Sequence, residues 1–140
     1  MPLTNGFNHI ATLTTDLDRF KAWYLEVFDA PTTFEMAAEG DHPRMAIIDM
    51  GGGAALNVFE VGADQIIGDQ RRIGARGAID HFGLAVADRT ALEDVRDRLE
   101  RAGADIGEIQ ILGGDTYSLF FRDVDGMELE VCAPVGADGS

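Results

Sequence analysis

The chain has 140 residues, 46% of them hydrophobic, and a net charge of −14 at pH 7, so it forms one domain or two very small ones. Nucleic acids and anionic membrane surfaces are excluded as partners, because both are bound through clustered Lys and Arg. The single cysteine, Cys132, excludes an internal disulfide, and the lack of a signal pattern or of a run near the ~20 apolar residues of a membrane helix predicts a cytoplasmic protein.

The first half of the chain is expected to form a strand, a helix and three further strands. Alternating residues predict a strand over about 6–13, and Thr15 or Asp16 is the expected N-cap of a helix that runs to about Phe28. Pro31 prevents this helix from continuing. Three strand candidates follow, separated by the turn sequences EGDHP and GGG, over about 32–37, 44–50 and 54–61.

The second half is expected to form the same elements in the same order. A strand over about 78–87 leads to Asp88, the predicted N-cap of a helix that the glycine of RAGAD ends. The three strands that follow are predicted over about 108–112, 117–122 and 127–132, the last two joined by a tight turn at Asp125 and Gly126.

The two halves are an internal repeat of one supersecondary unit. An offset of 72 residues superposes four pairs: His9 and His81, Asp16 and Asp88, Phe20 and Leu92, Trp23 and Val95. Module one then covers about 6–61, a linker about 62–77, and module two about 78–134. Three arginines gather in that linker, Arg71, Arg72 and Arg76; they are either solvated linker residues or an anchor for a substrate carboxylate or phosphate.

The repeated histidines are predicted to lie on the sheet face opposite the helices. Residues two apart in a strand share a face, so the apolar set around His81 packs on the helices while His81 points away with Gly83. His9 likewise shares its face with Ala11. The small residues Ala11 and Gly83 leave room for a ligand beside each imidazole.

The last strand of each module carries a glutamate near its end, Glu60 in module one and Glu130 in module two. A carboxylate among apolar residues is costly without a strong partner. Two imidazoles and two carboxylates form a plausible shell for one divalent ion, of Fe, Mn, Ni, Co or Zn. Glu128 competes with Glu130, because both lie on the same face of their strand.

Other reactive groups have simpler interpretations. Cys132 shares a strand face with Glu130, which makes it either a cavity residue or a small buried apolar one. His42 lies in a turn, where solvent exposure is expected. The sequence has no Ser–His–Asp arrangement and no glycine-rich phosphate loop, because GGG joins two strands.

The motifs NHI, DHFGLAV and FFRDVDGMELEV together resemble the vicinal oxygen chelate superfamily, which includes glyoxalase I, fosfomycin- and bleomycin-resistance proteins, extradiol dioxygenases and methylmalonyl-CoA epimerase. The last motif is similar to the family's closing signature, with Val124 where Pro is usual. The resemblance implies an α+β fold in which two β-α-β-β-β modules form an eight-stranded open cup with helices on its outer face. A homodimer is implied too, with the site within one chain or across two.

The resemblance also implies roles for the four candidate ligands. His9, Glu60, His81 and Glu130 fall on the ligand positions of glyoxalase I, and either glutamate could detach to act as a general base. His9, His81 and Glu130 alone match the triad of the extradiol dioxygenases. Tyr117 and Cys132 are weaker candidates for the substrate pocket, with Ala11 and Gly83.

Departures from the family pattern separate its members. Leu13 stands where glyoxalase I has a glutathione-anchoring Arg, and Asp64 stands where it has Asn. Ala11 replaces a Thr of the fosfomycin enzymes, and Glu60 is a fourth acid that the dioxygenases do not use. These departures disfavour a glutathione substrate and leave lyase or isomerase chemistry open beside extradiol-type ring cleavage.

Two functions follow as predictions. The first is a metal-dependent enzyme that binds a small oxygenated substrate through two oxygens on one divalent ion. The second is a metal-independent protein of the bleomycin-resistance type that sequesters an antibiotic or another hydrophobic ligand, through aromatic residues such as Phe7, Phe59, Tyr117 or Phe121. The substrate and the metal do not follow from the sequence.

Overall fold

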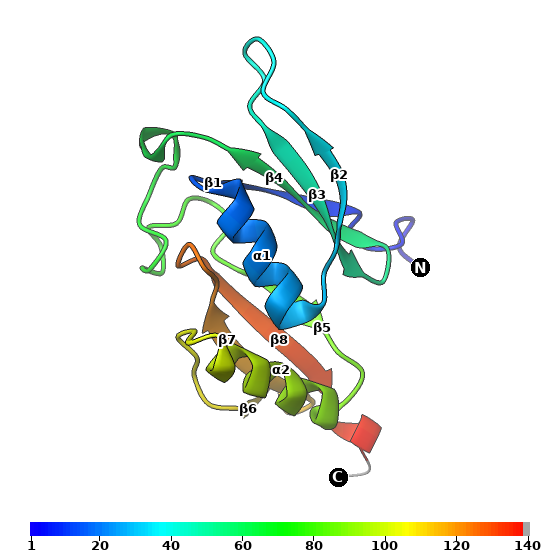
Figure 1. Cartoon of the computed structure of the whole chain (residues 1–140). Coiled ribbons are helices and arrows are strands. Elements are labelled where there is room, and N and C mark those ends of the chain that lie inside the picture. The colour runs from blue at the N-terminus through cyan, green and yellow to red at the C-terminus, as the bar shows by residue number, and fades with distance from the viewer. Residues whose placement is uncertain (139–140) are drawn as a thin grey trace. The chain divides into compact units, whose positions relative to one another are not determined.

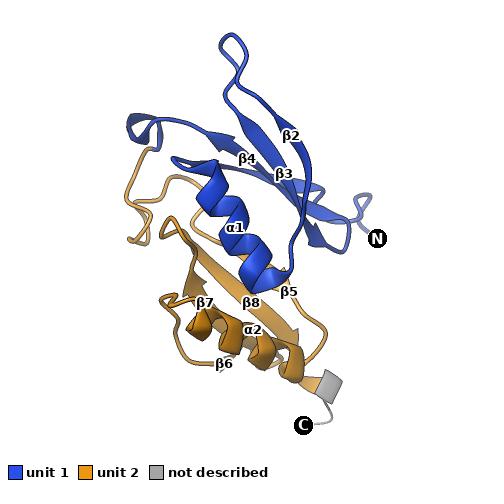
Figure 2. Ribbon diagram, viewed as in Figure 1, with its two compact units in different colours: residues 1–66 blue, residues 67–140 orange. Residues whose placement is uncertain are grey.

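The computed structural model describes residues 1–138, which form two compact units, Met1–Ile66 and a second unit that begins at Ile67 (Figure 2). The boundary between the units falls inside the segment that the sequence marks as a linker. Each unit has its own sheet and its own helix, and each is described by itself.

Unit 1 contains one four-stranded sheet and one helix (Figure 1). The sheet has the strand order β1-β4-β3-β2, in which β1 runs parallel to β4 and the other neighbours are antiparallel. Its elements are β1 His9–Thr14, α1 Leu17–Phe28, β2 Thr32–Met36, β3 Met45–Gly51 and β4 Ala54–Glu60, followed by the short 3-10 helix η1 Ala63–Gln65.

Helix α1 begins and ends at residues suited to those positions. The side chain of Asp16 accepts the N–H of Arg19 at 3.1 Å, which satisfies a donor of the first turn. Asp29 ends the helix with a left-handed backbone, at φ 54°. The apolar stripe of the helix is buried and contacts β3 and β4; its buried members are Leu17, Phe20, Tyr24 and Val27.

Unit 2 repeats this design. Its sheet has the order β5-β8-β7-β6, again with one parallel pair, β5 and β8. Asp88 caps α2 by accepting the N–H of Ala91 at 2.9 Å, and α2 contacts β7 and β8. The elements are β5 Phe82–Ala85, α2 Arg89–Arg101, β6 Gln110–Leu112, β7 Thr116–Arg122, β8 Glu128–Pro134 and the 3-10 helix η2 Val135–Asp138.

The predicted fold class is confirmed, because the chain is α+β and each unit carries a four-stranded mixed sheet with one helix. Both predicted N-caps, Asp16 and Asp88, are confirmed as well. The first strand of unit 2 is shorter than predicted and begins at Phe82 rather than near residue 78, because residues 78–81 form no strand ladder. No helix within residues 1–138 has the length and apolar character that crossing a membrane requires.

Candidate functional site

In unit 2 the structure brings His81 and Glu130 together. The parallel pairing of β5 with β8 sets Gly83 opposite Glu130, and His81 lies two residues before Gly83 on the same face. The imidazole Nε2 of His81 is 3.4 Å from Oε1 of Glu130. The two side chains therefore present one nitrogen and one oxygen to the same point.

The other nitrogen of His81 is already bonded. Nδ1 lies 2.9 Å from Oδ2 of Asp80, so a neutral imidazole carries its proton on Nδ1 and donates it to that carboxylate. Nε2 then keeps its lone pair, which is the form of histidine that binds a metal ion. The hydrogen bond from His81 and the guanidinium of Arg76 hold the pKa of Asp80 below its ordinary value.

Arg76 is buried beside this pair, with 1% of its side chain exposed. Its Nη1 lies 2.8 Å from Oδ2 of Asp80 and its Nη2 lies 2.7 Å from Oε2 of Glu128. Its Nε donates to the carbonyl of Gln70 at 2.8 Å. Arg76 is therefore neither a solvated linker residue nor an available anchor for a substrate, because its donors are directed at the protein.

Glu130 is held on its second oxygen as well. The buried hydroxyl of Ser118 donates to Oε2 at 2.5 Å, which leaves Oε1 facing His81. Cys132 is the next residue on that face of β8; burial first, and then the charge of Glu130, raise the pKa of its thiol to about 11. The thiol is therefore protonated at neutral pH.

Small and aromatic side chains shape the space around the pair. A Cβ built on Gly83 would lie 3.6 Å from the sulfur of Cys132 and 3.9 Å from Oε1 of Glu130, so the glycine keeps that space open. The ring of Phe120 meets the imidazole of His81 edge to face at 5.3 Å between centroids. Phe120 also borders a pocket of about 220 Å³, which is lined by Asp105, Ile106, Gly107, Phe120, Phe121, Arg122 and Glu128.

Two aromatic residues proposed for a pocket lie on the other face of β7. Tyr117 is 4% exposed, and the guanidinium of Arg89 from helix α2 lies over its ring at 4.9 Å. Phe121 is also buried, and it is four residues from Tyr117 on the same face. Phe120 points to the opposite face of β7 and is the aromatic residue beside His81. The alternation of side chains along β7 could have identified it from the sequence.

In unit 1, His9 has the same local geometry as His81. Its Nδ1 lies 2.8 Å from Oδ1 of Asn8, the residue immediately before it, as Asp80 is before His81. The offset of 72 residues thus repeats the acceptor together with the imidazole. His9 is exposed, and Ala11 follows it on the exposed face of β1.

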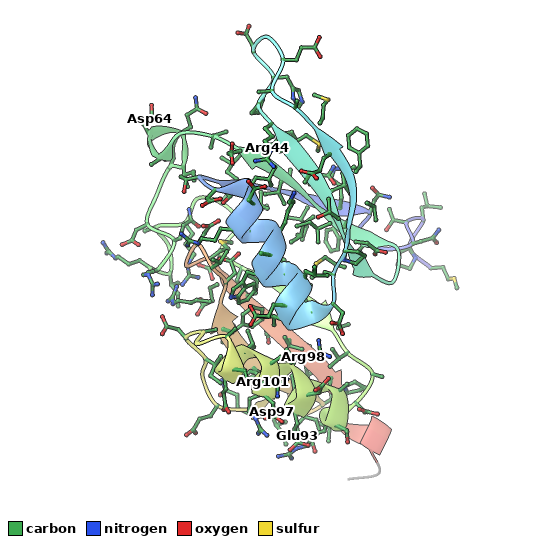
Figure 3. All side chains as sticks on the ribbon, viewed as in Figure 1. Arg44, Asp64, Glu93, Asp97, Arg98 and Arg101 are labelled. Carbon is green, nitrogen blue, oxygen red and sulfur yellow. The ribbon has the colours of Figure 1, made fainter. Side chains whose placement is uncertain are left out.

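The structure does not bring Glu60 to His9. In the β1–β4 ladder Glu60 lies opposite Thr14, whereas His9 lies opposite Ala55; five residues of strand span about 16 Å, and an odd count reverses the face. The carboxylate of Glu60 accepts the N–H of Leu17 at 2.8 Å, and Arg44, which is labelled in Figure 3, lies 3.7 Å from that carboxylate. Glu60 therefore supports the N-terminus of α1 on the helix side of the sheet.

Asn57 occupies the position in unit 1 that Glu130 occupies in unit 2. Ala11 lies opposite Asn57, and Gly83, its counterpart, lies opposite Glu130. The sequence comparison paired Glu60 with Glu130 because both are glutamates, and it therefore missed the correspondence of Asn57 with Glu130. A signal was available, because buried apolar residues flank both positions: Leu56 and Val58 around Asn57, Leu129 and Val131 around Glu130.

The donor chemistry of unit 2 fits a divalent ion. Two ligand atoms about 2.1 Å from one ion are separated by about 3.4 Å at a tetrahedral angle, and Nε2 of His81 and Oε1 of Glu130 have that separation. Within residues 1–138, no group of three or more His, Cys, Asp or Glu side chains is assembled to hold a metal. The pair of unit 2 thus needs a further ligand.

A family model and a similar crystal structure both point to the same protein family. The model described as "Glyoxalase/Bleomycin resistance protein/Dioxygenase superfamily" matches residues 6–131. The crystal structure of a glyoxylase/bleomycin resistance protein/dioxygenase domain from Frankia sp. EAN1pec is 28% identical, with a TM-score of 0.76 over 94% of this chain and 98% of that one. No curated protein sequence matches.

Two more distant structures share the fold. A mutant of the fosfomycin resistance protein FosX from Listeria monocytogenes, complexed with Mn(II) and 1S,2S-dihydroxypropylphosphonic acid, is 16% identical, with a TM-score of 0.68 over 92% of this chain and 90% of that one. TnmS3, an antibiotic binding protein from Streptomyces sp. CB03234, is 15% identical, with a TM-score of 0.68 over 96% and 99%. At these identities the likeness concerns the fold alone.

Proposed function

Because this chain belongs to the glyoxalase/bleomycin resistance protein/dioxygenase superfamily, we propose that it is a metal-dependent enzyme whose ligands are His9, His81 and Glu130. The observation that supports this most strongly is the pair in unit 2, with Nε2 of His81 3.4 Å from Oε1 of Glu130 and each side chain fixed by a second bond. His9 has a matching Nδ1 bond and supplies the third ligand, from the same chain or from a second copy.

The proposed substrate is a small molecule with two neighbouring oxygens. Two imidazoles and one carboxylate leave coordination positions open. When bound, a divalent ion would polarise the substrate oxygens and stabilise the negative charge that develops on them. This supports lyase or isomerase chemistry and extradiol-type ring cleavage alike, and Fe, Ni, Mn, Co and Zn all accept the ligand set.

The protein's own residues perform the remaining tasks. Ser118 holds Oε2 of Glu130, so one oxygen of that carboxylate is directed at the site. Oε1 of Glu130, the oxygen that Ser118 leaves free, is the atom placed to take a proton from the substrate. Phe120 gives the site an apolar wall that restricts water.

Metal content tests the proposal directly. Purified, tag-free protein is reconstituted with each of Fe(II), Ni(II), Mn(II), Co(II) and Zn(II), desalted, and measured by elemental analysis. We expect close to one ion per site in the wild type and in His42→Ala, whose imidazole is exposed in a turn and bonds to Pro43. The double variant His9→Ala/His81→Ala should hold none. A wild type that binds no metal after reconstitution contradicts the proposal.

A second candidate function is metal-independent sequestration of an antibiotic or another hydrophobic ligand. It is supported by Asn57, a neutral amide where unit 2 has a carboxylate. Phe59 lies two residues from Asn57 on the same face and is the aromatic residue that such a ligand would contact. The test is equilibrium binding of hydrophobic antibiotics to chelator-treated protein. Binding that survives in Glu130→Gln supports this function over the enzyme.

A further inference from the structure

We propose that Arg76 and Asp80 are positioning residues that fix the imidazole of His81 and that reserve Glu130, rather than Glu128, as its carboxylate partner. The inference rests on the proposed function, because it assigns the ring of His81 to a metal ion. It follows from three contacts of one buried guanidinium.

The first contact orients the acceptor of His81. Nη1 of Arg76 lies 2.8 Å from Oδ2 of Asp80, and it also donates to the backbone carbonyl of Asp80 at 3.3 Å. The same Oδ2 accepts Nδ1 of His81 at 2.9 Å. An acceptor held by a buried cation cannot rotate away, so the ring stays in the orientation that directs Nε2 at Glu130. The proton also stays on Nδ1.

The second contact removes a competing ligand. Glu128 and Glu130 lie on the same face of β8, and the sequence alone does not choose between them. Oε2 of Glu128 lies 2.7 Å from Nη2 of Arg76, whereas Oε1 of Glu130 faces His81. An ion pair to a buried guanidinium draws Glu128 away from the imidazole and neutralises its charge.

The third contact connects the arrangement to the loop that carries Arg76. Nε of Arg76 donates to the carbonyl of Gln70, and Nη1 of Arg122 on β7 donates to the same oxygen at 3.2 Å. Nη2 of Arg122 donates to the carbonyl of Arg71 at 3.1 Å. Arg122 thus attaches the loop to β7 through two of its carbonyls, and the bond from Arg76 to Gln70 closes the loop on itself, which keeps the guanidinium of Arg76 between the two carboxylates.

Unit 1 supplies the natural comparison. Asn8 accepts Nδ1 of His9 at 2.8 Å, but its amide is neutral and exposed. The acceptor of His81 is an anion with a buried cation behind it. We therefore expect the ring of His81 to be held more firmly than the ring of His9.

The test uses variants of the full chain and two measurements. The ¹⁵N NMR spectrum of the metal-free protein, at a pH where imidazoles are neutral, reports which ring nitrogen carries the proton. Titration with Co(II) reports metal affinity. The variants are Asp80→Ala, Asp80→Asn, which keeps an oxygen acceptor as in Asn8, and Arg76→Lys. Asp94→Ala is the control, since it deletes an exposed carboxylate of the same unit, which pairs with Arg98 on helix α2 at 3.6 Å.

We expect Asp80→Ala to lose the Nδ1–H form of His81 and to bind Co(II) about 10- to 100-fold more weakly, the usual effect of losing a partner behind a metal ligand. Asp80→Asn and Arg76→Lys should fall between Asp80→Ala and the wild type, and Asp94→Ala should match the wild type. A retained Nδ1–H form or an unchanged Co(II) affinity in Asp80→Ala overturns the proposal.

Failure of the proposed function gives a different result. A wild type that binds no Co(II) contradicts the metal site, while the NMR spectra of the same metal-free proteins still show whether Asp80 fixes the ring. Should Arg76→Lys fail to fold, as its thermal melt would show, the comparison of Asp80→Ala with Asp80→Asn decides the question alone.

Discussion

The two units have the same order of elements, and an aspartate caps the helix of each, yet only unit 2 brings an imidazole and a carboxylate together. In unit 2, His81 and Glu130 face each other, and each is held by further polar groups, Asp80 and Ser118. In unit 1, His9 is exposed and lies opposite Ala55, and the position that corresponds to Glu130 holds the neutral Asn57. The repeat of a fold unit therefore does not imply the repeat of its chemistry.

The physical difference lies in charge and burial. A carboxylate beside an imidazole needs partners for its remaining lone pairs, and unit 2 supplies Ser118 of β7 for Glu130 and Arg76 for Asp80. Unit 1 directs its own carboxylate, Glu60, to the N-terminus of α1 instead. This contrast can be tested by exchanging or deleting single groups in each unit.

The largest expected effect comes from deleting each histidine separately. His81→Ala should weaken metal binding by more than about 100-fold, beyond the usual effect of losing a supporting residue, because it removes a ligand from the paired half of the site. His9→Ala should cost less, since His81 and Glu130 remain together. Isothermal titration with Zn(II) measures both; equal losses would show that the two units contribute equally.

A carboxylate introduced at position 57 should make unit 1 more similar to unit 2 in metal binding. Asn57→Asp places a negative charge where unit 2 has Glu130, and added ligand charge tightens the binding of divalent ions, by about tenfold at this site. Asn57→Ala is the matched control and should change affinity little. Zn(II) affinities that do not differ between Asn57→Asp and Asn57→Ala would show that position 57 lies outside the site.

Substitutions of Glu60 should change the stability of the fold and leave metal binding unchanged. Glu60→Ala removes the acceptor of the Leu17 N–H and should lower the free energy of unfolding by about 1 kcal/mol, as the loss of a helix cap does. Glu60→Gln keeps an acceptor and should cost less. Metal content should be unchanged in both, and elemental analysis beside thermal melts measures it. Loss of metal in Glu60→Gln would place Glu60 in the site after all.

The smallest effect concerns the exposed ion pairs of unit 1. A hydrogen bond from Arg44 holds the pKa of Asp18 below its ordinary value, and one from Lys21 does the same for Glu35. A carboxyl whose folded pKa is lowered stabilises the fold above its unfolded pKa, and this contribution is lost as the pH falls through the folded pKa.

Stability should therefore fall slightly as the pH drops below about 4. Melting temperatures of the wild type and of Arg44→Met across this range measure it. The variant should show the shallower dependence, because it lacks the cation that lowers the pKa of Asp18. Parallel curves would mean that these exposed pairs contribute nothing.

Much of the fold could be predicted from the sequence, because it is written in local patterns. The spacing of apolar residues places α1 and α2, and Asp16 and Asp88 mark their starts through hydrogen bonds to residues three positions away. The repeat of His9 and His81 indicates two copies of one unit. The motifs NHI, DHFGLAV and FFRDVDGMELEV indicate the superfamily, which the match over residues 6–131 confirms. These signals need only neighbours in the chain.

Pairing across the sheet decided the rest. Whether Glu60 or Asn57 shares a face with His9 depends on the register of β1 against β4, and a shift of one residue reverses every side chain. The choice between Glu128 and Glu130 depends on Arg76, which reaches β8 from a loop more than fifty residues earlier. Local sequence patterns cannot predict such contacts, because these contacts form only when segments far apart in the chain pack together and their charged groups pair.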